Sequence, residues 1–252
     1  MTLPLRFEDL PEEDQSRLRS AMAQLSSLAG SYSNFLVIGE ATGDTPVWNI
    51  ASCFAVRLRE REFVITAAHV YRHYQRRRLA QPSVHAQAGR LMIPLHERER
   101  YVSDDLDIAV FDLAELNTRL LGRDFYVTNR LAPVVAPVES DYVQFSGFPA
   151  YYRQDVATRE SSLAALNGFV EVTGAEHGRI YCHVDRDYML EFGPEALPPA
   201  STVLGGLSGG PVLMRGTLHY PVVGLISEFL ASLDVFKCAI FTEEVDAALG
   251  AA

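Results

Sequence analysis

The order of hydrophobic and polar residues divides the chain into a helical start and a long β-rich remainder. The apolar residues that recur at helical spacing within residues 1–30 are Leu18, Met22, Leu25 and Leu28. Pro11 and the acidic residues after it suit a first helical turn, and Gly30 suits a helix end. We therefore expect a helix in the first 30 residues.

From residue 31 onward, short runs of β-branched and aromatic residues replace the helical spacing. They cover residues 35–38, 51–58, 63–66, 91–95, 108–113, 142–145, 168–172, 179–184, 212–214, 222–226 and 235–241. Many short strands with few helical patterns are typical of all-β barrels or sandwiches. Residues 130–138 carry two prolines and predict an extended connector between two halves. Residues 242–249 predict a small C-terminal helix.

Composition and charge narrow the function classes. The chain is 48% hydrophobic and 21% charged, which is globular composition, and no apolar run approaches the roughly 20 residues that span a bilayer. The start turns acidic where a signal peptide needs an apolar core, so we expect a cytoplasmic protein without membrane attachment. The net charge of −10 disfavours nucleic-acid binding. The basic cluster at residues 76–78 fits a solvated face of a short helix better than an anion site.

The cysteines predict neither a metal site nor a disulfide framework. Cys53, Cys182 and Cys238 are odd in number, widely separated and without a CxxC pair. Each lies in an apolar, strand-like run. We expect three reduced thiols in the core, no bound metal and no disulfide.

The glycine-rich segment GGLSGGP, residues 205–211, is the strongest candidate for chemistry. Four glycines around Ser208 leave its hydroxyl uncrowded and allow unusual backbone turns. A serine nucleophile needs that exposure and also needs nearby backbone N–H groups to bind an oxyanion. The alternative is an ordinary glycine-rich turn.

A serine nucleophile also needs a base and an orienting carboxylate. His69 follows the strand-like run 63–66 and two alanines, which leave room for a substrate. Asp107 precedes the apolar run 108–111, so partial burial is expected for it. Asp104 and Asp105 belong to a polar turn and fit a solvated position better.

Together these segments resemble the trypsin/chymotrypsin-like serine peptidases of bacterial type. TAAH at residues 66–69, DIAV at 107–110 and GLSGGP at 206–211 look like the histidine, aspartate and serine motifs of that family, in its order. VGLIS at 223–227 is similar to the strand that follows the nucleophile. YVQFSGFP at 142–149 is similar to the first strand of the second barrel. The resemblance covers about residues 31–250.

The resemblance implies a fold and a domain plan. It implies two antiparallel six-stranded β-barrels, with an extra helix at the N-terminus and another at the C-terminus. We expect an N-terminal helical extension over residues 1–30. Residues 31–130 would form the first barrel with His69 and Asp107, and residues 131–252 the second barrel with Ser208.

The resemblance also implies the role of each site residue. Ser208 would attack a peptide carbonyl, His69 would take its proton and Asp107 would orient His69. The backbone N–H groups of Gly206 and Ser208 would form the oxyanion hole. Ser227 would support Asp107 and pair with the substrate backbone. The substrate would be a protein or peptide, and no metal or organic cofactor is implied.

The sequence departs from the family pattern at several positions. Leu207 stands where activated digestive members carry an aspartate, and Val70 stands where secreted relatives carry a disulfide cysteine. Thr202 stands where an acid would select basic substrates. Phe229 stands near the glycine that leaves the specificity pocket open, and Glu228 is expected to flank the cleft. A small or medium uncharged residue before the scissile bond is therefore expected.

Two other readings compete with a peptidase. The GxSxG pattern around Ser208 also fits α/β-hydrolases, but those need an acid and then a histidine downstream, and His219 precedes both later aspartates. A peptidase fold kept as a binding or scaffold subunit of a regulated system, for example in defence or stress, usually loses a triad member, whereas all three are present here. In such a system the N-terminal helix would dock a regulatory partner or cover the cleft. A helix of this kind more commonly packs on a barrel without any regulatory role.

Overall fold

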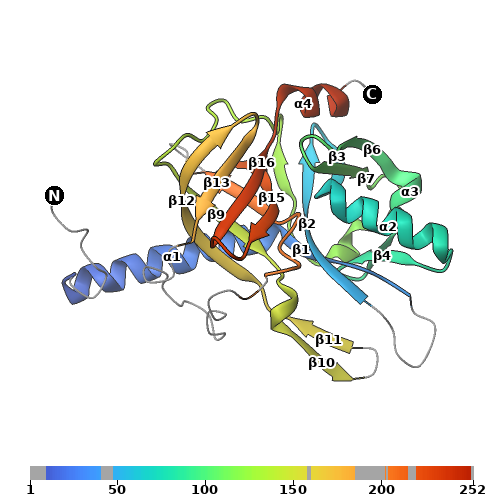
Figure 1. The fold of residues 1–252 in the computed structure, drawn as a ribbon, viewed down its shortest axis with the longest axis horizontal. Coiled ribbons are helices and arrows are strands. Elements are labelled where there is room, and N and C mark those ends of the chain that lie inside the picture. Colours follow the sequence, from blue (N-terminus) through green and yellow to red (C-terminus); the bar gives the residue numbers. More distant parts are fainter. Residues whose placement is uncertain are drawn as a thin grey trace.

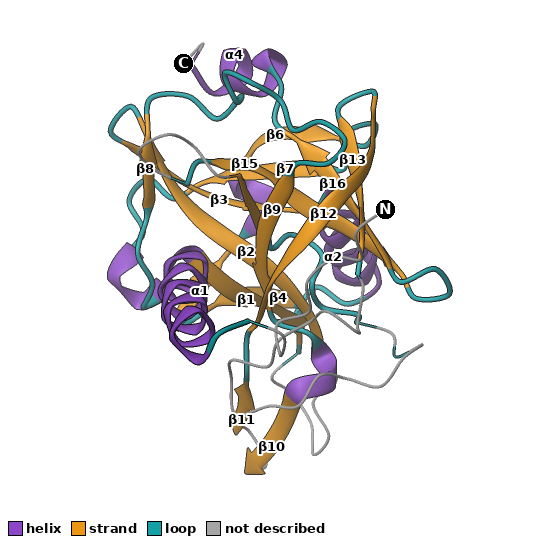
Figure 2. Cartoon of the chain, turned by 90° about the vertical axis from the view of Figure 1, so that its left-hand side faces the viewer, coloured by secondary structure: helices purple, strands orange, loops and turns teal. Residues whose placement is uncertain are grey.

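The computed structural model describes residues 10–40, 48–157, 160–184, 202, 204–214 and 220–250. Within this part, strands dominate and a helix lies near each end of the chain (Figures 1 and 2). The all-β prediction with two terminal helices is therefore confirmed.

The first half of the chain forms an eight-stranded sheet. Its strands are β1 (Ser33–Gly39), β2 (Trp48–Leu58), β3 (Arg61–Thr66), β4 (His85–Ala88), β5 (Leu91–Ile93), β6 (Glu99–Ser103), β7 (Ile108–Asp112) and β8 (Tyr126–Thr128). They follow the order β5-β4-β1-β2-β3-β7-β6, and β8 pairs in parallel with β2. Unlike the six-stranded barrel expected, this sheet has eight strands and its described ends, β5 and β6, do not pair. Both end strands are short and, among the described strands, pair on one edge only, β5 with β4 and β6 with β7.

The second half forms a closed barrel of six strands, as expected. The strands are β9 (Tyr142–Gly147), β12 (Leu166–Glu176), β13 (Arg179–His183), β14 (Pro211–Met214), β15 (Val222–Leu230) and β16 (Val235–Ile240). The order around the barrel is β12-β13-β16-β15-β14-β9. A two-stranded hairpin, β10 (Arg153–Ala157) with β11 (Glu160–Leu163), extends away from the barrel in Figure 1.

Three helices cover the first sheet or join it to the rest of the chain. α2 (Ala68–Ala80) and α3 (Leu95–Arg98) lie on the side of the first sheet in Figure 1. α4 (Glu243–Gly250) follows the barrel in sequence, yet Val245 and Leu249 are buried in the core of the first sheet. The Asp246 carboxylate accepts the N–H groups of Leu131 and Ala132 at 2.7 and 3.0 Å. α4 thereby holds the connector between the two halves.

α1 (Glu12–Tyr32) is longer than the sequence predicts. It does not end at Gly30 but continues to Tyr32, and Ser33 begins β1. A Cβ at Gly30 would lie 3.8 Å from the amide of Asn167, an ordinary contact, so the helix continues through this position without strain. The last turns of α1 contact the barrel, and the Gln144 side chain donates to the Leu25 carbonyl at 2.5 Å.

The first half of α1 extends away from the body (Figure 1). Leu18, part of the predicted apolar face, is 41% exposed. The apolar face is therefore only partly packed against the protein. Among the described helices, none is long and apolar enough to cross a membrane.

The three cysteines are free and buried. Burial raises the pKa of Cys53, and a hydrogen bond with Cys182 together with burial raises the pKa of Cys238. Since the thiolate is the reactive form, the raised pKa keeps the Cys53 and Cys238 thiols protonated and inert.

Candidate active site

His69 lies at the beginning of a helix. β3 ends at Thr66, and α2 begins at Ala68, so His69 is in the first helical turn and not at the end of the strand. Ala67 and Ala68 are fully buried, while the His69 side chain is 52% exposed. The small buried residues anchor the turn, and the imidazole remains open to solvent.

Asp107 holds His69 through both its backbone and its ring. Its carboxylate accepts the His69 N–H at 2.9 Å and lies 2.9 and 3.1 Å from Nδ1 of the ring. The first N–H groups of a helix have no partner within the helix, so a carboxylate at this position satisfies one of them. Asp107 also accepts the Ser227 hydroxyl at 2.7 Å.

These contacts set the charge state of Asp107. Burial raises the pKa of this carboxyl, but the hydrogen bond and charge of His69 and the hydroxyl of Ser227 outweigh it. The pKa therefore lies below its usual value, which keeps the carboxylate ionised. Its backbone adopts φ 58°, a left-handed conformation that aspartate tolerates better than most residues. Asp104 is instead paired with Arg72 on the surface, as expected for a solvated residue.

Ser208 lies in a tight loop before β14. Gly206 has φ 103° and Gly209 φ 91°, values that favour glycine. The Ser208 hydroxyl donates to the Ser227 carbonyl at 2.9 Å. Ser208 and His69 line the same cleft, but no hydrogen bond joins their side chains, because the Ser208 hydroxyl is bound to Ser227.

Two N–H groups of this loop, those of Gly206 and Ser208, donate no hydrogen bond to any described residue. The Gly205 carbonyl accepts the N–H of Ala150 at 2.7 Å. Because the C=O and N–H of one trans peptide point in opposite directions, this bond turns the Gly206 N–H away from Ala150. The Leu207 carbonyl, which shares a peptide unit with the Ser208 N–H, accepts the N–H of Gly210 at 2.9 Å. This bond turns the Ser208 N–H away from Gly210. Both groups are thus available to an anionic oxygen.

The cleft around these residues has a volume of about 480 Å³. The lining residues are His69, Asp104, Asp107, Arg179, Leu204, Gly205, Ser208, Ser227, Glu228, Phe229 and Lys237. Ser227, Glu228 and Phe229, which the sequence nominates for substrate binding, are among them. Thr202 is half-buried and is not among the lining residues. The loop 185–200 lies outside the described residues.

Sequence reasoning missed the two cations of the cleft, Arg179 and Lys237. Lys237 lies between two buried residues of β16, so strand alternation turns it outward, opposite Glu228 in the neighbouring strand. The Lys237 ammonium lies 4.0 Å from the Glu228 carboxylate. Alternation was the available signal, but the pairing of β15 with β16 was needed to place the residue in the cleft.

The Phe229 ring is half-buried and packs against another ring in the barrel. Its centroid lies 4.8 Å from that of Phe236. This packing holds a large apolar side chain in the lining of the cleft that contains Ser208.

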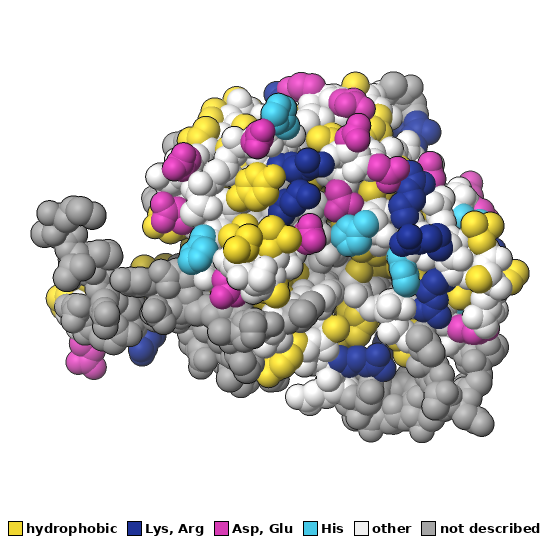
Figure 3. Space-filling model, in the orientation of Figure 1, with side chains coloured by type: hydrophobic (Ala, Val, Ile, Leu, Met, Phe, Trp, Pro, Cys, Tyr) yellow, Lys and Arg dark blue, Asp and Glu magenta, His cyan; other side chains and the backbone are white. Residues whose placement is uncertain are grey.

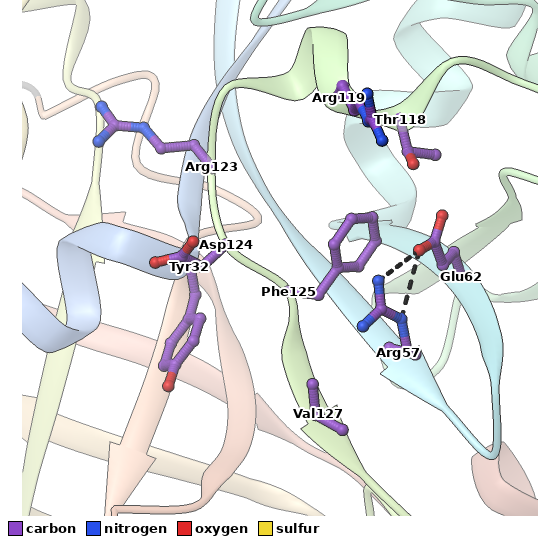
Figure 4. Close-up of a pocket in the computed structure, with 9 residues that line it drawn as sticks. All are labelled: Tyr32, Arg57, Glu62, Thr118, Arg119, Arg123, Asp124, Phe125 and Val127. Carbon is purple, nitrogen blue, oxygen red and sulfur yellow. Dashed lines mark hydrogen bonds and ion pairs between the residues drawn. The ribbon is translucent and has the colours of Figure 1, made fainter.

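A larger hollow, of about 700 Å³, lies elsewhere on the first sheet (Figure 4). Arg57 binds Glu62 there at 2.7 Å and lies over the Phe125 ring, while Arg123 points away from this group. None of the predicted catalytic residues lines this hollow.

The charges on the visible face of the molecule are mixed. Figure 3 shows acidic and basic side chains interspersed over this face. In the described part of the chain, no group of His, Cys, Asp and Glu side chains is arranged to hold a metal ion.

Comparisons with known proteins identify the fold. No family model and no curated protein match this chain. Solved structures do match: a thermostable serine protease, AL20, from an extremophilic microorganism is 14% identical, with a TM-score of 0.46 over 87% of this chain and 96% of its own. A Glu endopeptidase in complex with MPD is 12% identical, with a TM-score of 0.47 over 85% and 88%. An inactivated protease paralogue of the scabies mite, S-I1, is 13% identical, with a TM-score of 0.50 over 86% and 94%.

At these identities the similarity shows the fold alone. The chain has the chymotrypsin-like fold of serine proteases. One of the three similar structures is an inactivated paralogue, so the fold itself does not establish activity.

Proposed function

We propose that this protein is a serine endopeptidase that uses Ser208, His69 and Asp107. The observation that carries the proposal is the set of hydrogen bonds at the cleft. Asp107 binds the Nδ1 side of His69 and the hydroxyl of Ser227, and Ser208 binds the carbonyl of the same Ser227. A nucleophile, a base and an oriented carboxylate at one cleft are the parts that acyl transfer requires.

The first step begins with rotation of the Ser208 hydroxyl. It leaves the Ser227 carbonyl and donates to Nε2 of His69. As Ser208 Oγ attacks the peptide carbonyl, its proton passes to Nε2, and the ionised Asp107 stabilises the resulting imidazolium. The carbonyl π electrons move to its oxygen, which the N–H groups of Gly206 and Ser208 bind.

The second half of the reaction releases the products. The tetrahedral intermediate collapses, the C–N bond breaks and His69 gives its proton to the leaving amine. Water then attacks the acyl-enzyme, with His69 again taking and returning a proton. This releases the carboxylic acid product and restores the Ser208 hydroxyl.

Specificity for a small or medium uncharged residue before the scissile bond remains part of the proposal. Thr202 carries no charge, and the half-buried Phe229 ring takes up room in the cleft that contains Ser208. A cationic side chain entering a desolvated pocket would need a carboxylate there. A positional-scanning peptide library measures this preference, and dominant cleavage after Arg or Lys would contradict it.

Location and partners are also proposed from the sequence. We place the protein in the cytoplasm, without membrane or nucleic-acid partners. The exposed first half of α1 is the surface we propose for a regulatory partner protein. Described residues of α1 do not line the cleft, so the described helix does not support the reading in which it covers the site.

Labelling with a fluorophosphonate probe tests the proposed activity. Such a probe forms a covalent bond only with an activated serine, so the wild-type protein should be labelled at Ser208. Ser208→Ala should give no labelling and should lower kcat by about 10⁴- to 10⁶-fold with the fold intact. A folded wild-type protein that is neither labelled nor able to cleave a proteome-derived peptide library would overturn the proposal.

A further inference from the structure

Ser52, in β2 of the first sheet, is fully buried and contacts the nucleophile loop of the second barrel. Its hydroxyl donates to the Gly206 carbonyl at 2.7 Å and accepts the Phe148 N–H at 2.8 Å. Its N–H donates to the Ser208 carbonyl at 2.9 Å. Its own carbonyl accepts the Thr66 hydroxyl at 2.7 Å. All of its polar groups are therefore used at the junction of the two halves.

The hydroxyl of Ser52 connects the two segments that shape the oxyanion hole. One is the loop with Gly206, whose N–H is a predicted donor to the oxyanion. The other contains Phe148 and Ala150, and Ala150 orients the Gly205 carbonyl. With one bond accepted and one donated, the Ser52 hydroxyl holds both segments at a fixed spacing.

Gly206 needs this restraint because of its backbone. It has φ 103°, and glycine allows many other values. Its own carbonyl is held by Ser52 alone among the described hydrogen bonds. Without that bond, the peptide unit between Gly206 and Leu207 would keep only one described bond, the longer one from the Leu207 N–H to the Leu204 carbonyl, at 3.4 Å. A rotation of this unit would shift the adjoining Gly206 N–H from the oxyanion position.

The surroundings of Ser52 fit a small hydroxyl. A side chain at Gly147 would lie 2.9 Å from the Ser52 hydroxyl, and one at Gly209 would lie 2.1 Å from its carbonyl oxygen. The backbone at the end of β9 and the backbone of the nucleophile loop therefore both approach Ser52 closely. An alanine would fit this space but would leave a buried carbonyl and a buried N–H without partners.

We propose that Ser52 is a positioning residue that holds the oxyanion hole of the barrel from the first sheet. The inference rests on the proposed peptidase function and adds to it a residue outside the triad. Ser52 does not contact the substrate in this role and acts through Gly206 and Phe148.

The test is Ser52→Ala, assayed for peptide hydrolysis. Loss of one oxyanion donor typically costs about 10²- to 10³-fold in kcat, so partial misplacement of the Gly206 N–H should cost about 10- to 100-fold. KM should change by less than about threefold, because ground-state binding does not use this N–H. The affinity for a peptide boronate, which places an anionic oxygen in the hole, should fall in parallel with kcat.

Two matched variants separate positioning from general destabilisation. Asn34→Ala removes a buried hydrogen bond, from the Asn34 amide to the Leu121 carbonyl, in the same sheet. Ser33→Ala removes a buried hydroxyl that has no described partner. Asn34→Ala should lower Tm about as much as Ser52→Ala, and both controls should keep wild-type kcat and boronate affinity. If Ser52→Ala does not fold, Ser52→Cys keeps a donor and an acceptor at this position, both weaker than those of the hydroxyl, and should show the same losses in smaller degree.

The outcomes separate this inference from the proposed function. Wild-type kcat and boronate affinity in the folded Ser52 variant would overturn the role of Ser52, as would an equal kcat loss in Asn34→Ala. If the wild-type protein is labelled and active, those results leave the peptidase function standing. A wild-type protein without labelling and hydrolysis would overturn both.

Discussion

The two halves of the molecule hold the proposed catalytic residues in different ways. In the first sheet, His69 and Asp107 are joined to each other directly, by side-chain and backbone hydrogen bonds. In the barrel, Ser208 lies in a glycine loop whose carbonyls and N–H groups are held by neighbouring backbone and by Ser52. The acid–base pair is built within one half, whereas the setting of the nucleophile is built between the two.

This difference shows where the site is sensitive. The pair of His69 and Asp107 depends on the turn before α2 and on the turn before β7. The nucleophile depends on the contact between sheets, which Ser227 extends by donating to Asp107 across it. Substitutions within one half should therefore act on the chemistry of a single group. Substitutions at the contact should act on alignment.

The largest loss of kcat is expected from a substitution within the first half of the molecule. Asp107→Asn should lower kcat by about 10⁴-fold, because the amide favours the wrong tautomer of His69. Asp104→Asn and Asp105→Asn should each cost less than about tenfold, since exposed charges contribute little. Steady-state hydrolysis by the three variants measures this, and equal losses at all three positions would remove the case for Asp107.

An intermediate effect is expected at the contact between the halves. Ser227→Ala removes a hydrogen bond to an ionised carboxylate, a loss of about 1.5–3 kcal/mol that corresponds to roughly 10- to 100-fold in kcat if it falls on the transition state. Ser146→Ala is the control, because this buried serine of the same barrel has no described partner for its hydroxyl. Equal kcat in both variants would mean that Asp107 needs no support from the barrel.

A smaller effect concerns stability against acid. The pKa of Asp107 is lowered in the folded state, so its ionised form stabilises the fold above the usual value near 3.8. That contribution is lost as pH falls through the lowered pKa. The urea midpoint of the wild type should exceed that of Asp107→Asn at pH 5 and approach it below about pH 3. A difference that stays constant down to pH 2 would contradict the assigned shift.

The smallest effect on activity is expected from removal of the exposed part of α1, far from the contact between the two halves. A chain that begins at Leu25 lacks the exposed part of α1 but keeps the turns on the barrel. Its kcat/KM should stay within about twofold of wild type, because truncation is tolerated where little backbone is buried. Gln144→Ala, which removes the bond to the Leu25 carbonyl, should lower Tm without changing kcat. Loss of activity in the truncated chain would give α1 a part in catalysis.

The strands with apolar runs could be predicted from the sequence, and those without could not. All eleven predicted runs lie in or overlap observed strands. The missed strands β4, β6, β8, β10 and β11 are short, and several are polar. β6, for example, contains Glu99 and Arg100 and is mostly half-exposed, so it has no buried face to give it an alternating pattern. Gly30 was misread as a helix end, because a glycine near the end of an apolar helical pattern looks the same in sequence whether the helix stops or continues.

The site shows the same division between local and distant signals. Ser208, His69 and Asp107 lie in local motifs and could be nominated from sequence. Ser52 gave no signal, because its partners are about a hundred positions or more away in the chain. The eight-stranded count of the first sheet and the position of Lys237 likewise depend on pairing between distant strands.

The position of α4 has a consequence for the timing of synthesis. Val245 and Leu249 complete the core of the first sheet, and Asp246 fastens the connector. The half of the protein that is translated first therefore cannot complete its core until the segment around residue 250 has left the ribosome. A nascent chain thus acquires the His69–Asp107 pair in a finished setting only after the loop with Ser208 has also been made. Under the proposed function, an incomplete chain would therefore not cut the proteins around it.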